Sequence, residues 1–230
     1  FNGLSHKLLM MSMDEGLNEP THATRVFFER SFGLPVDAKL TWTDHVFIKP
    51  PWPLLVCSSP TLSPQPKDWD ANLQIIGPLV LPGDVTTKKK PPDAALVAFL
   101  KQGGAPVYIG WGSMICKSPE HMAELAIRAL YDTGERGIVF SGYADLSAAS
   151  FDATAPDYDA VQAYAKENIY FAKDLNHEWL FPQCKMTVHH GGSGTTHCAL
   201  RAGRPTVITP VFLEQFTYRR LITSLGCGVG

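Results

Sequence analysis

Short apolar runs alternate with helical segments from residue 93 to the last residue, and this alternation constrains the fold more than any other feature. The apolar runs 107–110, 137–140, 168–171, 186–189 and 206–209 are predicted strands. Helices are predicted at 94–102, from 118–120 to a stop at Gly134, and at 178–181, 193–202 and 214–225. Residues 144–166 are expected to be a long loop with a short helix. We predict an α/β fold with a Rossmann-like parallel sheet flanked by helices, whose ligands bind beyond the carboxyl ends of the strands.

The first 92 residues lack this alternation, and many of them are prolines. A helix is expected near 21–32, and eleven prolines between residues 35 and 92 preclude long helices after it. Two apolar runs, 54–57 and 73–76, are predicted strands. The stretch 77–92 has the character of an interdomain linker.

Composition excludes several classes of protein. With 45% hydrophobic residues the chain can bury a core, and its net charge of −2 argues against a nucleic-acid partner, which needs an excess of clustered Lys and Arg. The single basic run, 88–90, precedes two prolines and is interpreted as a solvated linker.

The five cysteines form no Cys-x-x-Cys pair, which indicates buried thiols in a reducing compartment, so we expect a cytoplasmic protein. No stretch of about 18 apolar residues predicts a transmembrane helix. The sequence starts at Phe1 and stops where a helix runs into a strand, so both ends are expected to be cut from a longer protein.

The segment 189–196, His-His-Gly-Gly-Ser-Gly-Thr-Thr, carries the clearest chemistry. It follows an apolar strand and opens a helix. Its glycines let a ligand approach the backbone, and the free N–H groups and dipole of the helix favour negative charge. The hydroxyls of Ser193, Thr195 and Thr196 and a ring N–H of His190 are further donors. We predict a site for a phosphate or diphosphate that needs no metal.

Other interpretations fit this segment less well. It is not a Walker loop, because no Lys-Ser/Thr follows the glycines, and it lacks the spacing of a nucleophile elbow around Ser193. A turn that binds nothing remains an alternative. A zinc site of His189, His190 and His197 is disfavoured, because neighbouring residues of a strand point to opposite faces.

Glu214 and Gln215 follow Pro210, at the start of the last predicted helix. A carboxylate can accept hydrogen bonds from two hydroxyl groups, and an amide can both donate and accept hydrogen bonds. Opposite a phosphate site, this pair suits a polyhydroxylated ligand. An ordinary acidic first turn of a helix is the alternative.

Together these segments resemble the donor-binding signature of UDP-sugar glycosyltransferases of the GT-B fold, above all the sterol 3-beta-glucosyltransferases. The segments that carry the resemblance are 177–184 (HEWLFPQC), 189–196, 202–205 (AGRP) and Pro210 with Glu214-Gln215. The segment 107–114 (VYIGWGSM) resembles the first strand and Gly-Ser loop of the family's C-terminal domain. Residues 59–69 resemble the segment before its interdomain linker.

The resemblance implies roles for particular residues. The UDP diphosphate would contact His190, Gly192, Ser193, Gly194 and Thr195, with Gly112 and Ser113 closing over it. The backbone of Leu175-Asn176-His177 would bind the edge of the uracil, and Glu214 and Gln215 would bind glucose hydroxyls. No metal and no cofactor is expected.

Several residues depart from the family pattern or invite a wrong assignment. The family usually has Pro at Asn176 and often Asp at Glu214, and where plant members carry a ribose-binding Glu this chain has Cys198, so ribose contacts must come from elsewhere. Trp179 is assigned to packing rather than to stacking on uracil. Two Asp-x-Asp triplets, at 68–70 and 157–159, are interpreted as coincidental matches to the metal-sugar signature of another glycosyltransferase fold.

The resemblance further implies three parts: the end of an acceptor-binding domain at 1–82, a linker at 83–92, and a UDP-sugar-binding domain at 93–230 that is truncated at its C-terminus. It implies inverting transfer of a hexose, glucose, from UDP-glucose to a hydroxyl of a lipid such as a sterol. The catalytic base is expected in an N-terminal region outside this sequence, so the catalytic residue is unknown and these residues alone are expected to be inactive. Peripheral membrane contact fits a lipid acceptor, and the oligomeric state is unknown. The alternative function is a non-catalytic UDP-sugar-binding subunit or sensor that needs a partner chain.

Overall fold

The computed structural model describes residues 30–31, 53–69, 71–80 and 92–230. The chain divides into two compact units: Phe1–Cys57 with Gln65–Ile76, and Ser58–Pro64 with Gly77–Gly230. In the first unit, β1 (Leu54–Val56) pairs in parallel with β2 (Leu73–Ile75), with Leu54 opposite Leu73. Most of the helix predicted at 21–32 and the basic run 88–90 lie outside the described residues.

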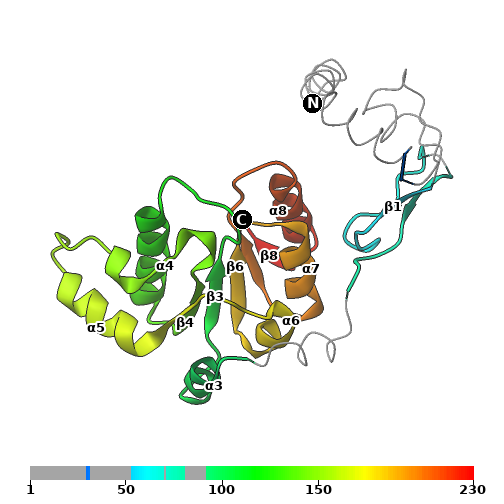
Figure 1. Cartoon of the computed structure of the whole chain (residues 1–230). Coiled ribbons are helices and arrows are strands. Elements are labelled where there is room, and N and C mark those ends of the chain that lie inside the picture. Colours follow the sequence, from blue (N-terminus) through cyan, green and yellow to red (C-terminus); the bar gives the residue numbers. More distant parts are fainter. Residues whose placement is uncertain (1–29, 32–52, 70, 81–91) are drawn as a thin grey trace. The chain divides into compact units, whose positions relative to one another are not determined.

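The second unit contains a six-stranded parallel sheet with the strand order β5-β4-β3-β6-β7-β8 (Figure 1). Its strands are β3 (Val107–Gly110), β4 (Gly137–Phe140), β5 (Ile169–Ala172), β6 (Met186–His189), β7 (Thr206–Ile208) and β8 (Gly228–Val229). The chain adds β4 and β5 on one side of β3 and adds β6, β7 and β8 on the other side. The order therefore reverses between β3 and β6, where parallel sheets bind ligands.

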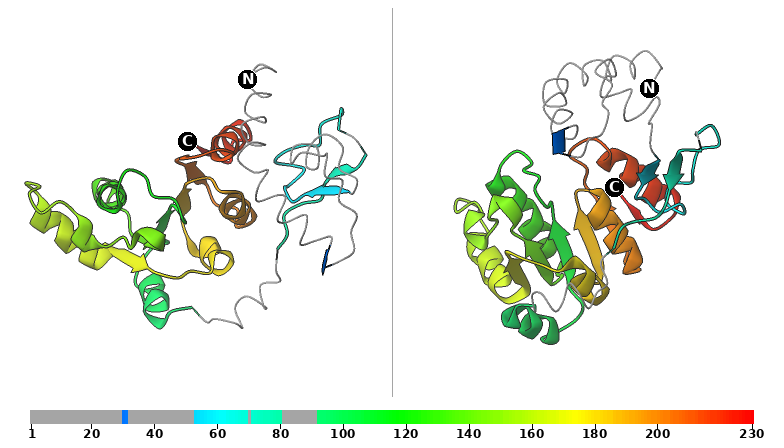
Figure 2. Two further views of the ribbon diagram at one scale, coloured as in Figure 1. Left: turned by 45° about the horizontal axis from the view of Figure 1, so that its top comes forward. Right: turned by 45° about the vertical axis from the view of Figure 1, so that its right-hand side comes forward.

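Helices cover both faces of this sheet, as α4 (Pro119–Thr133) and α5 (Tyr158–Asn168) lie on one side and α7 (Ser193–Arg201) and α8 (Gln215–Ser224) on the other (Figures 1 and 2). The strand β3 separates two hydrophobic clusters. Val107 and Ile109 pack with α4 and α5, whereas Tyr108 packs with α3 (Ala94–Lys101), α6 (His177–Leu180) and α7. Burial on both faces explains the continuous apolar run of β3. The predicted α/β fold is confirmed.

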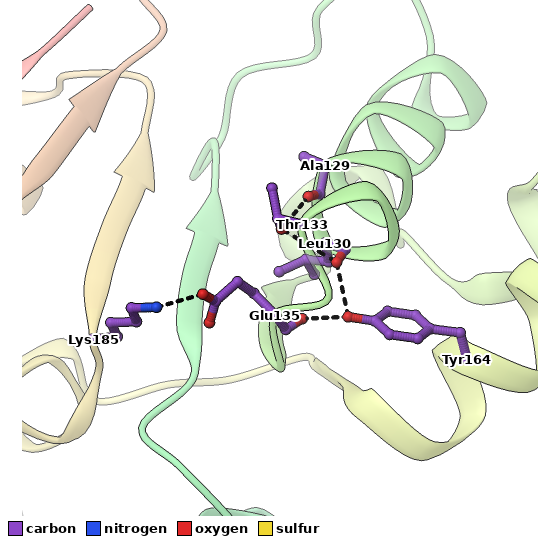
Figure 3. Close-up of polar contacts among 6 residues, drawn as sticks. All are labelled: Ala129, Leu130, Thr133, Glu135, Tyr164 and Lys185. Carbon is purple, nitrogen blue, oxygen red and sulfur yellow. Dashed lines mark hydrogen bonds and ion pairs between the residues drawn. The ribbon is translucent and has the colours of Figure 1, made fainter.

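The C-terminal end of α4 shows how a sequence-predicted stop is built (Figure 3). Gly134 adopts the left-handed conformation with a φ of +65°, and the Tyr164 hydroxyl on α5 lies 2.8 Å from the Leu130 carbonyl oxygen and 2.7 Å from that of Glu135. The Glu135 carboxylate forms an ion pair with Lys185, just before β6. The C-terminal end of α4 therefore contacts both α5 and the residue that precedes β6, one of the two central strands of the sheet.

The expectation of a long loop with a short helix at 144–166 holds in part, because α5 begins at Tyr158 but is an eleven-residue helix that runs to Asn168. Two short 3₁₀ helices precede it, at Gly142–Ala144 and Ala148–Ser150. Val161 and Ala165 are buried in the cluster with α4, and Arg128 of α4 binds both carboxylate oxygens of Asp157, with one contact at 2.7 Å. Since this pairing comes from a distant part of the chain, the local sequence does not reveal it. Asp157 belongs to an Asp-x-Asp triplet and is used here as a structural ion pair.

Smaller shifts affect other bounds. The side chain of Asn176 accepts a hydrogen bond from the Trp179 N–H at 3.3 Å, so α6 begins at His177. A 3₁₀ helix, Phe181–Gln183, follows it directly. Glu214 is the N-cap of α8 instead of its first helical residue. None of the helices in the described part of the chain is both long and apolar enough to cross a bilayer.

Candidate functional site

The predicted phosphate turn lies at the switch point of the sheet. Gly110, which ends β3, is opposite His189, which ends β6, so the loops after these two strands are neighbours. The loop after β7 joins them, because the Thr209 N–H donates to the His189 carbonyl at 2.9 Å and the Trp111 indole N–H donates to the Thr209 hydroxyl at 3.0 Å. Loops from three adjacent strands are therefore held together at this edge.

The helix α7 opens toward this edge with an uncapped N-terminus. Its N-cap is Gly192, which has no side chain to accept the first N–H groups. Ser193 and Thr195 are half-buried and Gly194 is exposed, so none of the three is sealed in the core. These amides and the positive end of the helix dipole are arranged to bind an anion.

Gly194 is unusual because the fold gives no reason for a glycine there. A Cβ atom built at Gly194 meets no heavy atom within 4 Å. Glycine inside a helix is less favourable than alanine by roughly 0.5–1 kcal/mol. The open space above Gly194 is therefore a feature that binding, rather than folding, can explain.

The Ser193 side chain is held ready to donate. The Tyr218 hydroxyl on α8 donates to Ser193 Oγ at 2.9 Å, which leaves the Ser193 hydroxyl proton available for another acceptor. His197 Nε2 accepts the Ser59 N–H at 3.0 Å, so the ring proton is assigned to Nδ1, which donates to the Ser193 carbonyl at 2.8 Å. The expected donor role of Thr196 is wrong, since Thr196 is buried and its hydroxyl donates to the Gly192 carbonyl at 3.0 Å.

His190 lies between the two glycine loops. A Cβ atom would approach the His190 ring to 3.1 Å if placed on Gly112 and to 2.5 Å if placed on Gly192, so the ring packs against both backbones. Burial lowers the pKa of His190, while the nearby Glu214 carboxylate and the Gly110 backbone partly oppose this shift. Its Nδ1 is buried without a hydrogen-bond partner of good geometry. The structure thus brings the predicted residues His190, Gly112 and Gly192 together.

His189 has a different role from its neighbour. It is fully buried, and its Nδ1 accepts the Gly191 N–H at 3.0 Å, which shapes the turn. Burial lowers its pKa to about 3, with a further contribution from His190 and His177. His197 is committed to Ser193 and Ser59, and the described residues contain no group of three or more His, Cys, Asp or Glu side chains able to hold a metal ion.

A cavity of about 830 Å³ lies beside this turn. Among the residues that line it are Gly194 and Cys198 of α7 and the predicted uracil-binding residues Leu175, Asn176 and His177. The side chain of His177 is used internally, since its Nε2 lies 2.9 Å from the Tyr108 hydroxyl and burial lowers its pKa to about 4. The His177 side chain is therefore committed to Tyr108, and the contact of this loop with uracil stays a prediction.

Trp179 lines the same cavity and also packs against the cluster formed by α3, α6 and α7. Its predicted packing role is thus compatible with a position at the cavity wall.

The glycine loop after β3 packs tightly against Gly142, because a Cβ atom on Gly142 would lie 2.6 Å from the Gly112 carbonyl oxygen. Ser113, the other predicted residue of that loop, is exposed.

The two predicted sugar-binding residues differ in their exposure and in their hydrogen bonds. Glu214 is exposed at the start of α8, with its carboxylate close enough to raise the pKa of His190. Gln215 is buried, and its Oε1 accepts the N–H groups of Val211 at 2.8 Å and of Phe212 at 2.9 Å. The expectation that this amide both donates to and accepts from a sugar is corrected, because its acceptor is occupied and only the Nε2 group remains.

Sequence reasoning missed Tyr218, Tyr108 and Glu178 as parts of the site. Tyr218 and Tyr108 act through partners that are 25 and 69 positions away in the sequence, and no local pattern indicates such pairs. Glu178 lines the cavity and follows His177 directly, so its place beside the predicted uracil loop was a usable signal.

Comparisons with known proteins identify the family. Residues 157–230 match the family described as "Erythromycin biosynthesis protein CIII-like, C-terminal domain". A sterol 3-beta-glucosyltransferase of Arabidopsis thaliana is 38% identical over 170 residues, which are 74% of this chain and 24% of the relative. A sterol 3-beta-glucosyltransferase of Komagataella phaffii is 30% identical over 224 residues, covering 91% of this chain and 18% of the relative. The chain thus spans a quarter or less of the length of these relatives.

A solved structure described as the glycotransferase of kitacinnamycin has the same fold, with a TM-score of 0.57 and 19% identity over 97% of this chain and 53% of that one. The chain contains a glycosyltransferase domain of the GT-B fold. Within this domain, the phosphate turn and the cavity beside it occupy the carboxyl edge of the parallel sheet, and the resemblance to sterol 3-beta-glucosyltransferases is confirmed.

Proposed function

We propose that this chain supplies the UDP-sugar site of an inverting glucosyltransferase that transfers glucose from UDP-glucose to a hydroxyl group of a lipid such as a sterol. The observation that carries the proposal is the open space above Gly194. It joins an uncapped helix N-terminus to a cavity lined by residues of the loop 175–177. A nucleoside diphosphate has the two ends that this arrangement suits, an anion and a planar base.

The reaction exchanges one bond for another at the anomeric carbon of the sugar. The acceptor oxygen forms a bond to this carbon, the bond from the carbon to the UDP oxygen breaks with its electron pair going to the phosphate, and the acceptor proton passes to a base. The amides of Ser193, Gly194 and Thr195, the hydroxyl of Ser193 and a ring N–H of His190 stabilise the charge that develops on UDP. These residues supply the leaving-group half of catalysis, and the base belongs to the acceptor-binding part of the parent protein.

The sugar and the acceptor meet at the loop before α8. The exposed Glu214 carboxylate can accept hydrogen bonds from two sugar hydroxyls. Beside it, Val211, Phe212 and Leu213 are exposed, and Leu213 is 63% accessible. An apolar rim next to a polar sugar site supports a lipid acceptor, and this rim is where the protein would contact a membrane surface that presents the lipid.

Calorimetry with UDP, UDP-glucose and UDP-GlcNAc tests the proposal. The chain should bind UDP and UDP-glucose, and Ser193→Ala should weaken both about tenfold or more, because a hydrogen bond to a charged oxygen contributes roughly 1.5–3 kcal/mol. Ser224→Ala, at the far end of α8, is the matched control and should leave the affinity unchanged. Absence of UDP binding by the folded chain would overturn the proposal. UDP-sugar binding with no glucosyl transfer by the full-length parent would favour a sensor or subunit instead.

A further inference from the structure

The cavity beside Gly194 is lined by three carboxylates, and only one of them sits between the phosphate turn and the loop 175–177. Asp93 is committed elsewhere, since one of its oxygens accepts the Ala95 N–H at 2.9 Å and the other accepts the Tyr170 hydroxyl at 2.5 Å. Asp174 precedes Leu175 in the loop and is exposed. Glu178, the second residue of α6, follows the loop and faces α7.

The Glu178 carboxylate is held in place from α7. Arg201, in the last turn of α7, forms an ion pair with one of its oxygens, and both side chains are about one third accessible to solvent, at 34% and 35%. Each carboxylate oxygen carries two lone pairs. The ion pair with Arg201 therefore leaves the Glu178 carboxylate able to accept further hydrogen bonds. The arginine fixes where the carboxylate points.

Cys198 places this carboxylate next to the wall of the cavity. Cys198 lies four residues after Gly194 on α7, and residues four apart share one face of a helix. Burial and then the neighbouring Glu178 carboxylate raise the pKa of the Cys198 thiol to about 12. The same thiol hydrogen-bonds to the Glu178 carboxylate, which places that carboxylate at the cavity wall.

A nucleoside diphosphate in this cavity would have its ribose at this position. With its phosphates at the N-terminus of α7 and its base along the loop 175–177, the sugar ring falls near Gly194, Cys198 and Glu178. A carboxylate matches vicinal hydroxyls well, because it can accept a hydrogen bond from each of them. The acidic residue that contacts the ribose in dinucleotide-binding folds is an example. We propose that Glu178, positioned by Arg201, accepts hydrogen bonds from the ribose hydroxyls of the nucleotide. This inference rests on the proposed function.

Calorimetry with UDP and 2′-deoxy-UDP tests the assignment. The unmodified chain should bind UDP about tenfold more tightly than 2′-deoxy-UDP, the size expected of one hydrogen bond to a charged group. Glu178→Gln and Glu178→Ala should weaken UDP about tenfold more than they weaken 2′-deoxy-UDP, which keeps only the 3′-hydroxyl contact, so that the ratio of the two affinities approaches one. Asp174→Asn is the matched control and should keep the ratio.

Each result supports or overturns the inference. UDP binding without discrimination against the deoxy form, a ratio that survives both Glu178 variants, or a ratio that collapses in Asp174→Asn overturns it while leaving the proposed function standing. Failure of the unmodified chain to bind UDP overturns both. Circular dichroism and urea unfolding establish that each variant is folded, and the isosteric Glu178→Gln is measured if removal of the side chain prevents folding.

Discussion

At the residue scale, Gly194 separates binding from folding. Gly194→Ala should stabilise the fold by roughly 0.5–1 kcal/mol, because alanine is the better helix former and its Cβ meets nothing within 4 Å. The same methyl group occupies the space proposed for the nucleotide, so UDP affinity should fall. Urea unfolding and calorimetry on one sample measure the two effects, and unchanged UDP affinity would contradict the assignment of this space.

Gly191 provides the contrasting control, because there the fold itself requires glycine. Its φ is +90°, and a Cβ atom would lie 2.6 Å from the Cγ2 atom of Ile208 on β7. Gly191→Ala should therefore destabilise the protein by about 2 kcal/mol through backbone strain and overpacking. Two alanine substitutions three residues apart are thus expected to change stability in opposite directions.

At the element scale, the loop before α8 depends on one side chain. Gln215 Oε1 accepts the N–H groups of Val211 and Phe212, and Leu213 between them and the helix has a positive φ of 44°. Gln215→Ala removes both hydrogen bonds and should cost about 1–3 kcal/mol. Gln215→Glu keeps the acceptor oxygen and should retain most of the stability. Equal urea midpoints for Gln215→Ala and the unmodified chain would show that the loop is held by other contacts.

The elements that the sequence predicted well have their signals in short, local segments. The strands at 107–110, 137–140 and 186–189 have the predicted bounds, since each is an apolar run bounded by turn residues. The helix α4 begins at Pro119 after the capping Ser118 and ends before Gly134, as predicted. The length and bounds of α5 were not predicted, because its two buried residues and the Arg128 ion pair depend on another helix.

The same distinction holds within the candidate site. A strand, a glycine turn and a helix follow one another at 186–201, so the position of the phosphate turn could be predicted from the sequence. The occupied acceptor of Gln215 and the inward hydroxyl of Thr196 could not be predicted, because a side chain's hydrogen-bond partner is set by the folded geometry. The sequence pattern predicted where the site lies. The side-chain contacts of the folded protein determine which of its groups are free to contact a ligand.

At the scale of the whole molecule, buried histidines make the stability of the fold depend on pH. Burial is the main cause that lowers the pKa of His177 to about 4 and that of His189 to about 3, from an ordinary value near 6.5. Between pH 6.5 and about 4 the unfolded chain binds protons that the folded protein does not. Stability should therefore fall as the pH is lowered through this window, by roughly 1.4 kcal/mol per pH unit for each fully shifted histidine.

Urea unfolding at pH 7.5, 6.0 and 5.0 measures this slope above the range in which carboxylates titrate. His177→Gln should make the slope shallower and leave the contribution of His189, because a glutamine amide can replace Nε2 beside the Tyr108 hydroxyl without taking up a proton. Parallel curves for this variant and the unmodified chain would show that the ring is protonated as readily in the folded protein as in the unfolded one. The His177 ring of the folded protein stays neutral until the pH approaches about 4, so the Tyr108–His177 contact at the start of α6 should persist while global stability falls. Loss of UDP affinity through this contact is therefore expected only near pH 4, below the window in which stability declines.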